Sequence, residues 1–248
     1  MNQPTLTSLP DGYRALVFGA SGGIGAAFVA ALAADPRCGV VYAASRHPLP
    51  GEGKVRPLPF DLEDEASIAA AVAEASATGP LDIVLVATGL LHDGALQPEK
   101  TFRALDPMAF DRAFRINATG PALIAKHALP HLPRDRKAVF AALSARVGSI
   151  ADNRLGGWHA YRASKAALNM LIRNFAIELA MRHRQAVCVA LHPGTVATDL
   201  SAPFQSNVPP DKLFTPEHSA AALLRVIDNL TASDSGKLFA WDGLEIPY

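Results

Sequence analysis

Tyr161 and Lys165 are two side chains with acid–base chemistry, and they stand four residues apart in the segment Tyr-Arg-Ala-Ser-Lys. The apolar residues that follow recur at steps of three and four residues, which predicts a helix with one buried face. The phenol and the ammonium then share one face, one turn apart. A phenol ordinarily ionises at about pH 10, and a nearby cation lowers that pKa. The spacing indicates proton transfer at an oxygen atom, although a surface pair in which lysine covers the ring gives the same pattern.

A glycine-rich turn early in the chain has the features of a dinucleotide site. Ala15 to Phe18 form a short apolar run typical of a buried strand, and an alanine-rich helical segment follows the glycines. Glycines let the backbone approach a pyrophosphate, and the helix N-terminus offers it free N–H groups. A purely structural turn is the alternative, but both flanking elements are present. The residues that we expect to contact the dinucleotide are Gly19, Ser21, Gly22, Gly23, Ile24 and Gly25.

The residue that reads the adenosine ribose is expected at the end of the second strand, about 20 residues beyond the glycines. That strand is expected at Gly39 to Ala44, and Ser45 and Arg46 follow it. A carboxylate at this place would repel a 2′-phosphate, whereas a hydroxyl and a guanidinium would bind it. The pair predicts NADP(H) rather than NAD(H), unless Arg46 is only a solvated residue at a strand end.

The third strand is expected at Val55 to Phe60, as an edge or irregular strand because it contains two prolines. Asp61 and Leu62 follow, where they would meet an adenine; capping of the next helix by Asp61 or Asp64 is an equally good interpretation. A helix from about residue 65 to 77 leads to a strand at 83–87, whose end carries Ala87, Thr88 and Gly89. This βαβαβαβ order predicts an α/β fold with a parallel sheet layered by helices.

Two further polar side chains could join the site. The pattern from Pro107 to about Leu132 is helical, and the following Gly120 and Pro121 predict a kink or break near Asn117. Ser144 ends a strand expected at 139–143, at the sheet edge where ligands bind. The ordinary alternatives are a local backbone hydrogen bond for Asn117 and solvent exposure for Ser144.

The last third of the chain is expected to close the site. A strand at 186–191 runs into a segment that contains Pro193, Gly194, Val196 and Thr198. Residues 199–215 have no clear period, which is typical of a substrate lid, although a surface excursion is the alternative. Thr215 and Pro216 predict the start of a helix, and Leu238 to Trp241 are expected to form the last strand.

The chain has 248 residues, half of them apolar, and 23 basic against 23 acidic side chains. This composition predicts one domain, 1–248, with small-molecule partners, and gives no indication of nucleic-acid or membrane binding. Cys38 and Cys188 lie far apart in apolar runs, which indicates buried thiols in a reducing, cytoplasmic environment, with no disulfide and no metal site. No stretch reaches the roughly 18 apolar residues of a membrane span, and residues 1–12 lack the pattern of a leader.

Taken in order, six motifs resemble those of the short-chain dehydrogenase/reductase family over nearly the whole chain. They are Gly19-x-x-x-Gly23-x-Gly25, Asp61, Asn117, Ser144, Tyr161-x-x-x-Lys165 and Pro193-Gly194-x-Val196-x-Thr198. The segments around Ser144 and Tyr161 and the ending Trp241-Asp242-Gly243 are most similar to the branch of C-factor-like proteins and sniffer-type carbonyl reductases. The resemblance implies a single doubly wound Rossmann domain, with a parallel seven-stranded sheet and helices on both faces.

The resemblance also implies the roles of these residues. Tyr161 would protonate a carbonyl oxygen, Lys165 would lower the pKa of Tyr161 and hold the nicotinamide ribose, Ser144 would steady the substrate oxygen, and Asn117 would anchor a water. The motif from Pro193 to Thr198 would line the nicotinamide. The implied activity is the NADP(H)-dependent reduction of a ketone or aldehyde, or the reverse oxidation, in a homodimer or homotetramer joined through the helices at 107–132 and 158–184.

Two departures from the family pattern bear on the site. Ala87-Thr88-Gly89 replaces the usual Asn-Ala-Gly and removes an amide that would brace the cofactor loop. Ser144 is followed by Ala145 where the family often has a second, catalytic serine, so Ser144 could point away, with Ser149 as the nearby substitute. An NADP(H)-binding regulatory or signalling protein with little turnover is the alternative function, which the intact Tyr161, Lys165 and Asn117 disfavour, and a related isomerase, dehydratase or epimerase is a third.

Overall fold

A computed structural model describes residues 4–47, 50–94, 97–207 and 209–248. Its centre is an eight-stranded sheet in the order β10-β9-β6-β5-β4-β1-β2-β3, in which only the β9–β10 pair is antiparallel. The strands are β1 (Tyr13–Phe18), β2 (Cys38–Ser45), β3 (Val55–Pro59), β4 (Ile83–Val86), β5 (Ala138–Leu143), β6 (Ala186–His192), β9 (Leu238–Ala240) and β10 (Glu245–Ile246). The predicted doubly wound parallel sheet is confirmed, and β10 is one short strand more than expected.

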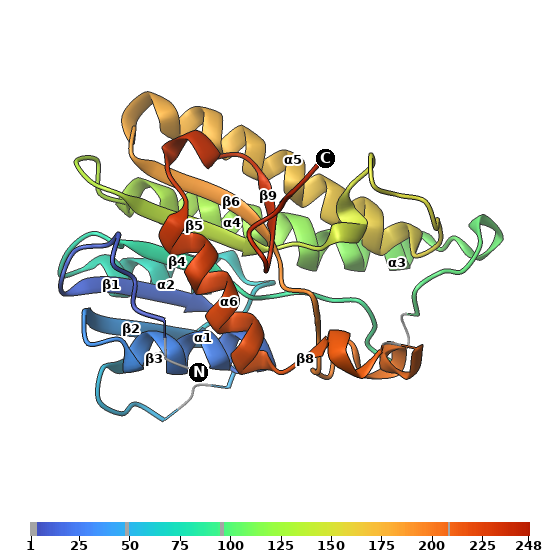
Figure 1. Ribbon diagram of the computed structural model, residues 1–248, viewed down its shortest axis with the longest axis horizontal. Coiled ribbons are helices and arrows are strands. Elements are labelled where there is room, and N and C mark those ends of the chain that lie inside the picture. Colours follow the sequence, from blue (N-terminus) through green and yellow to red (C-terminus); the bar gives the residue numbers. More distant parts are fainter. Residues whose placement is uncertain (1–3, 48–49, 95–96, 208) are drawn as a thin grey trace.

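Helices cover both faces of this sheet (Figure 1). They are α1 (Gly23–Ala34), α2 (Glu65–Ser76), α3 (Pro107–Phe114), α4 (Gly120–Ala128), α5 (His159–Arg182) and α6 (Pro216–Asn229). One core lies under α2, α4 and α5 and the other under α1 and α6. Successive residues of β1 alternate between the two: Leu16 and Phe18 pack in the first core, Ala15 and Val17 in the second. Strands buried on both faces are continuously apolar, which is why these short runs could be identified.

The strand order reverses between β1 and β4, so the loops after these neighbouring strands diverge to opposite sides of the sheet. The carboxyl ends of β1, β4, β5 and β6 meet at this edge, and a crevice forms there. The expected edge position of the proline-containing strand β3 is confirmed. Each segment that the sequence predicts for the site lies at the carboxyl end of a parallel strand, including the ends of β2 and β3, except for those on helices.

The helical pattern between Pro107 and Leu132 is continuous but irregular. Between α3 and α4 the chain forms a π-helical turn, η2 (Arg115–Thr119), and after α4 it tightens to the 3-10 turn η3 (Leu129–His131). The predicted distortion near Asn117 is therefore confirmed, and it is one widened turn rather than a break. Such turns often mark functional sites, because they change the direction of a side chain without ending the helix.

Several short elements were not expected. A two-stranded parallel sheet pairs β7 (Thr195–Val196) with β8 (Leu213–Phe214), and the 3-10 turns η5 (Ala202–Asn207) and η6 (Pro210–Lys212) lie between them. The segment 199–215 is thus more ordered than predicted, although residue 208 lies outside the described residues. Leu238–Ala240 is not the last strand, because β10 returns against it. The remaining 3-10 turns are η1 (Phe102–Ala104), η4 (Arg146–Gly148) and η7 (Ala232–Asp234).

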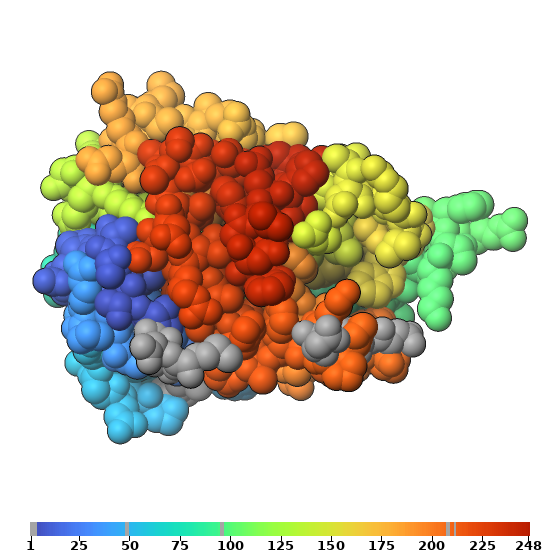
Figure 2. Space-filling model, viewed as in Figure 1, coloured from blue at the N-terminus to red at the C-terminus, as the bar shows by residue number. Residues whose placement is uncertain are grey.

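The green segment near residue 100, between β4 and α3, projects from the body of the molecule (Figure 2). Cys38 and Cys188 are buried and free, as predicted. Within the described ranges, no helix has both the length and the apolar content that a membrane crossing requires.

Candidate active site

The helix that carries Tyr161 and Lys165 begins at an unusual turn. Gly156, Gly157 and Trp158 all have positive φ, at 63°, 65° and 50°, and Trp158 is the one non-glycine residue with positive φ in the described part of the chain. A bulky residue adopts this conformation only where its surroundings hold it. Here the Trp158 N–H donates to the backbone oxygen of Glu99 at 2.5 Å. The buried Glu99 carboxylate accepts from the Ala160 N–H at 3.3 Å, so this acidic group caps α5.

Tyr161 and Lys165 lie on one face of α5, as predicted, but their ionisation differs from the expectation. The Lys165 ammonium lies 5.8 Å from the centroid of the Tyr161 ring and donates to the Leu143 oxygen at 2.9 Å. Burial raises the pKa of Tyr161 to about 12 and lowers the pKa of Lys165 to about 8. The predicted lowering of the phenol pKa is therefore not found here, because burial acts on Tyr161 while the Lys165 ammonium binds the Leu143 oxygen. Tyr161 is protonated at neutral pH.

Asn117 connects three parts of the site through its amide. Its Oδ1 accepts from the Leu90 N–H and its Nδ2 donates to the Leu90 oxygen, both at 2.8 Å. Nδ2 also donates to Ser164 Oγ at 3.1 Å. The π-helical turn thus ties the loop after β4 to the helix of Tyr161, and the fully buried amide keeps both segments in place.

Ser144, rather than Ser149, lies beside Tyr161. Both Ser144 and Tyr161 line a cavity of about 220 Å³, and the Ser144 hydroxyl donates to Asn169 Oδ1 at 2.7 Å. The Ser149 hydroxyl instead donates to the Pro247 oxygen and accepts from the Asp152 N–H, and it lines neither this cavity nor its neighbours. The absence of a second serine after Ser144 has therefore not moved the hydroxyl out of the site.

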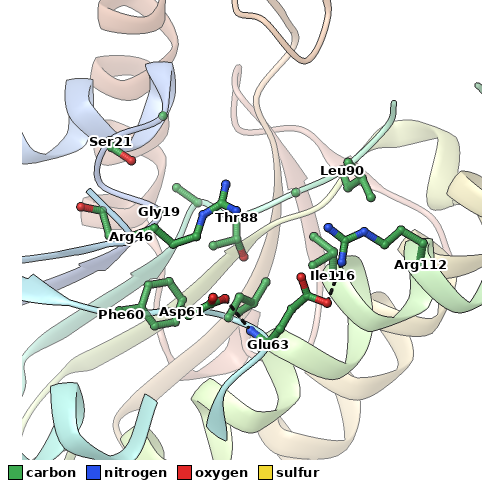
Figure 3. Close-up of a pocket in the computed structure, with 15 residues that line it drawn as sticks. Gly19, Ser21, Arg46, Phe60, Asp61, Glu63, Thr88, Leu90, Arg112 and Ile116 are labelled. Atoms are coloured by element: carbon green, nitrogen blue, oxygen red, sulfur yellow. Dashed lines mark hydrogen bonds and ion pairs between the residues drawn. The ribbon is translucent and has the colours of Figure 1, made fainter. Parts of the chain in front are cut away.

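A cavity of about 260 Å³ lies at the strand-order reversal (Figure 3). Ten of the predicted cofactor residues line it: Gly19, Ser21, Gly22, Ser45, Arg46, Asp61, Leu62, Ala87, Thr88 and Gly89. Arg46 reaches over the space that Ser21, Asp61 and Thr88 border (Figure 3). Asp64 caps α2 by accepting from the Ala66 N–H, whereas Asp61 accepts from the Glu63 N–H in the preceding turn. Of the two capping candidates, Asp64 is thus the helix cap.

The glycine turn fits a phosphate group. A Cβ atom at Gly25 would overlap the Gly19 oxygen, so only glycine lets the first turn of α1 approach β1 so closely. The N-cap Gly22 has no side chain to bind the N–H groups of that first turn. Helix N-termini of this kind bind anions through free N–H groups and the helix dipole. The donor set therefore matches a dinucleotide pyrophosphate.

The 220 Å³ cavity continues from the glycine turn to the catalytic candidates. Gly23, Ile24, Pro193 and Thr198 line it together with Tyr161, Lys165 and Ser144. The Thr88 hydroxyl, which lines both this cavity and the first, is buried without a hydrogen-bond partner in the described part of the chain. A buried orphan hydroxyl in such a place is satisfied when a polar ligand binds. This observation supports a nicotinamide ribose or a similar polyol group at this position.

A third cavity, of about 250 Å³, lies on the other side of Tyr161 and Ser144. Gly194 and Val196, which were expected near the nicotinamide, line this cavity instead of the second. Its aromatic wall is formed by Trp158 and Phe204, whose ring centroids are 5.1 Å apart. Asn117 and Gly25 are the two predicted site residues that line none of the three cavities.

Several site residues were not identified from the sequence. Glu99, Trp158, Phe204 and Glu63 follow no periodic pattern, and only the tertiary fold brings them to the site. Arg112 of α3 forms an ion pair with Glu63 at 2.6 Å beside the first cavity (Figure 3). Arg146 and His192 are close in sequence to Ser144 and Pro193, which were predicted to lie at the site. Their position next to predicted strand ends could therefore have identified them.

Comparisons with known proteins point to one family. Residues 13–209 match the family model described as short chain dehydrogenase. The C-signal of Myxococcus xanthus is 36% identical over 171 residues, which cover 69% of this chain and 95% of that protein. The 1-hydroxy-2-glutathionyl-2-methyl-3-butene dehydrogenase of Rhodococcus sp. (strain AD45) is 36% identical over 185 residues, which cover 74% of this chain and 76% of that protein.

Solved structures show the same fold. The NADPH-bound carbonyl reductase from chicken fatty liver superimposes with a TM-score of 0.83 at 27% identity, over 97% of this chain and 96% of that chain. The carbonyl reductase Sniffer of D. melanogaster gives a TM-score of 0.83 at 22% identity, over 97% of this chain and 100% of that chain, which supports the fold alone. The resemblance predicted from the six motifs is confirmed.

Proposed function

Because the chain belongs to the short-chain dehydrogenase family, we propose that this oxidoreductase uses NADP(H) to reduce a ketone or aldehyde, or to oxidise the matching secondary alcohol. The observation that carries the proposal is the position of Tyr161 and Ser144, which line both the cavity that continues from the glycine turn and the cavity beyond it. A substrate carbonyl between the two cavities would meet a proton donor on one side and a cofactor site on the other.

Each residue has a distinct task in this proposal. Tyr161 donates a proton to the carbonyl oxygen during reduction, and its high pKa keeps that proton in place at neutral pH. The Ser144 hydroxyl, which donates to Asn169 Oδ1 in the ligand-free site, would turn its O–H to donate to the same oxygen when substrate binds. Lys165 places a positive charge below Tyr161 and faces the cofactor cavity, where it is assigned to the ribose. Asn117 positions the loop at Leu90 and the helix at Ser164.

NADP(H) is the proposed cofactor, and it supplies or accepts the hydride when bound. Ser45 and Arg46 border the first cavity where the adenosine ribose is expected, and no carboxylate stands at the end of β2 to repel a 2′-phosphate. Gly19 to Gly25 would hold the pyrophosphate, Asp61 and Leu62 the adenine, and Thr88 a ribose hydroxyl. The NADPH in the chicken carbonyl reductase is in keeping with this choice.

The direct experiment measures oxidation of NADPH and NADH by the purified protein with a panel of ketones, aldehydes and quinones. Carbonyl-dependent oxidation of NADPH in preference to NADH is expected. Tight NADPH binding without turnover of any carbonyl would instead favour a cofactor-binding regulatory protein. That second candidate rests on the similarity to a protein named C-signal, and the intact set of Tyr161, Lys165 and Asn117 argues against it.

We further propose one domain with residues 199–215 as a lid, because Leu200, Ser201 and Phe204 border the third cavity. A homodimer, or a homotetramer as the alternative, is proposed through the helical segments at 107–132, which include α4, and 158–184, which include α5. A groove of about 470 Å³ separates these helices, and Met170, Ile177 and Met181 of α5 are exposed. The two buried free thiols support a reducing, cytoplasmic location.

A further inference from the structure

The third cavity combines an apolar wall with a small set of polar side chains. Leu91, Val147, Trp158, Leu200 and Phe204 supply apolar and aromatic surface. Tyr161 and Ser144 mark the side where a carbonyl would react, and Arg146 and His192 add a guanidinium and an imidazole to the lining. A cavity built in this way selects a ligand with an apolar body and a polar group in addition to the reacting one.

Arg146 is the charged side chain among the described residues that line this cavity. Its Nη1 donates to Asp152 Oδ2 at 2.9 Å, and both side chains are partly exposed. A guanidinium has five N–H donors, and the described residues provide an acceptor for one of them. The remaining donors are available to a ligand in the cavity. The carboxylates of Asp152, which binds Arg146, and of Asp242, which acts on His192, do not line the cavity, and Asp199 lines only the adjoining one.

His192 adds a polar group with one unpaired nitrogen. It ends β6, and its Nδ1 is buried without a hydrogen bond in the described part of the chain. Burial lowers the pKa of His192 to about 4, the positive charge of Arg146 acts in the same direction, and the negative charge of Asp242 opposes them with a smaller effect. The ring is therefore neutral at physiological pH, with one N–H donor and one acceptor nitrogen. Buried polar atoms are nearly always paired, so the orphan nitrogen points to a ligand group as its partner.

We propose that the substrate is a carbonyl compound with an apolar body and a carboxylate, which binds at Arg146 and His192 while the carbonyl lies at Tyr161 and Ser144. This inference rests on the proposed function and specifies its substrate class. Arg146 attracts the anion, and the neutral His192 ring donates a hydrogen bond to it. Trp158 and Phe204 cover the apolar part. A neutral ketone of the same shape would leave the Arg146 donors and the His192 nitrogen unsatisfied.

The test compares phenyl oxo-carboxylic acids, with two, three or four methylene groups between the carbonyl and the carboxyl group, with their methyl esters. Turnover with NADPH gives kcat/KM for each acid and ester, and calorimetry with the NADP+ complex gives their affinities without turnover. For the best chain length, the acid is expected to exceed its ester by about tenfold in both measurements. Acid and ester within twofold of each other at every length in both measurements would overturn the proposal.

Variants locate the effect. Arg146→Met keeps the aliphatic stem and is expected to lower the acid-to-ester ratio about tenfold, with the ester unchanged. His192→Phe keeps the ring volume and should lower the same ratio by a smaller factor. Arg154→Met, an exposed residue of the same loop that borders none of the three cavities, is the matched control and should leave the ratio unchanged. An equal effect of Arg146→Met and Arg154→Met would contradict a specific site.

The outcomes separate this inference from the proposed function. Reduction of esters and acids at equal rates would support carbonyl reduction as the function and contradict the proposed carboxylate site. Tighter binding of the acid without reduction of any carbonyl would leave the site in place and remove the proposed reaction.

Discussion

The Lys165 ammonium donates to the backbone oxygen of Leu143 at 2.9 Å, which joins the helix of Tyr161 to the last residue of β5. This contact explains why Lys165 does not hydrogen-bond the Tyr161 phenol in this structure. It also holds a buried charge close to the end of the strand that carries Ser144. The distance between the Lys165 ammonium and the Tyr161 ring thus depends on how α5 packs on β5.

The pKa of Lys165 makes stability depend on pH in a specific direction. Its pKa is about 8 in the folded chain against 10.5 as the reference value, so below about pH 8 both states hold the proton and the cost of burying the charge is fully present. Above that pH the folded state loses the proton first, the unfolded state binds more protons, and the free energy of unfolding rises. In urea titrations, the free energy of unfolding of the wild type, measured relative to that of Lys165→Met, should rise by about 2 kcal/mol between pH 7 and pH 9.5. A difference that stays constant over this range would contradict the assignment.

Arg46 should determine the preference between the two nucleotides. Arg46→Ala is expected to weaken NADPH binding about tenfold to a hundredfold and to leave NADH binding nearly unchanged, because only NADPH has a phosphate for the guanidinium. Fluorescence titration of both nucleotides measures this. Arg56→Ala, an exposed arginine on the neighbouring strand β3 outside the cavity, is the control. Equal affinities of the wild type for NADPH and NADH would sink the cofactor assignment.

Glu99 should stabilise the start of α5. Glu99→Ala leaves the Ala160 N–H without its acceptor and removes a negative charge from the helix N-terminus, so a loss of about 1–3 kcal/mol in the free energy of unfolding is expected. Glu99→Gln keeps an acceptor and should lose less. Chemical denaturation measures both, with Glu74→Ala on the exposed face of α2 as a control that should change little. Equal losses for Glu99→Ala and Glu74→Ala would show that the cap is not important.

Ser144 and Ser149 form a matched pair for the position of the substrate oxygen. Ser144→Ala should lower the rate of carbonyl reduction with little change in NADPH affinity, because its hydroxyl lines the cavity of Tyr161. Ser149→Ala removes a hydroxyl that binds the Pro247 oxygen, so its effect should fall on stability rather than on rate. Steady-state kinetics of both variants measure the two effects. A normal rate of carbonyl reduction in Ser144→Ala together with a reduced rate in Ser149→Ala would reverse the assignment.

Local pattern was enough to predict the features that local chemistry determines. The glycines after β1, the cap at Thr215 and the spacing of Tyr161 and Lys165 each depend on a few consecutive residues, and all lie where predicted. The aromatic wall of the third cavity joins Trp158 to Phe204 across two distant loops, so no periodicity reveals it. The predicted lowering of the Tyr161 pKa was wrong for a related reason: burial raises this pKa, and burial is a property of the tertiary fold.

Tyr161 supplies the proton to the substrate oxygen in the proposed reaction. Tyr161→Phe keeps the ring that packs beside Trp158 and removes the acidic group, so it isolates that role. With a carbonyl substrate identified for the wild type, the variant should bind NADPH with unchanged affinity and reduce the carbonyl about 100-fold to 10,000-fold more slowly, the usual contribution of general acid catalysis. A variant that binds NADPH and reduces the same substrate at a near-normal rate would rule out Tyr161 as the proton donor.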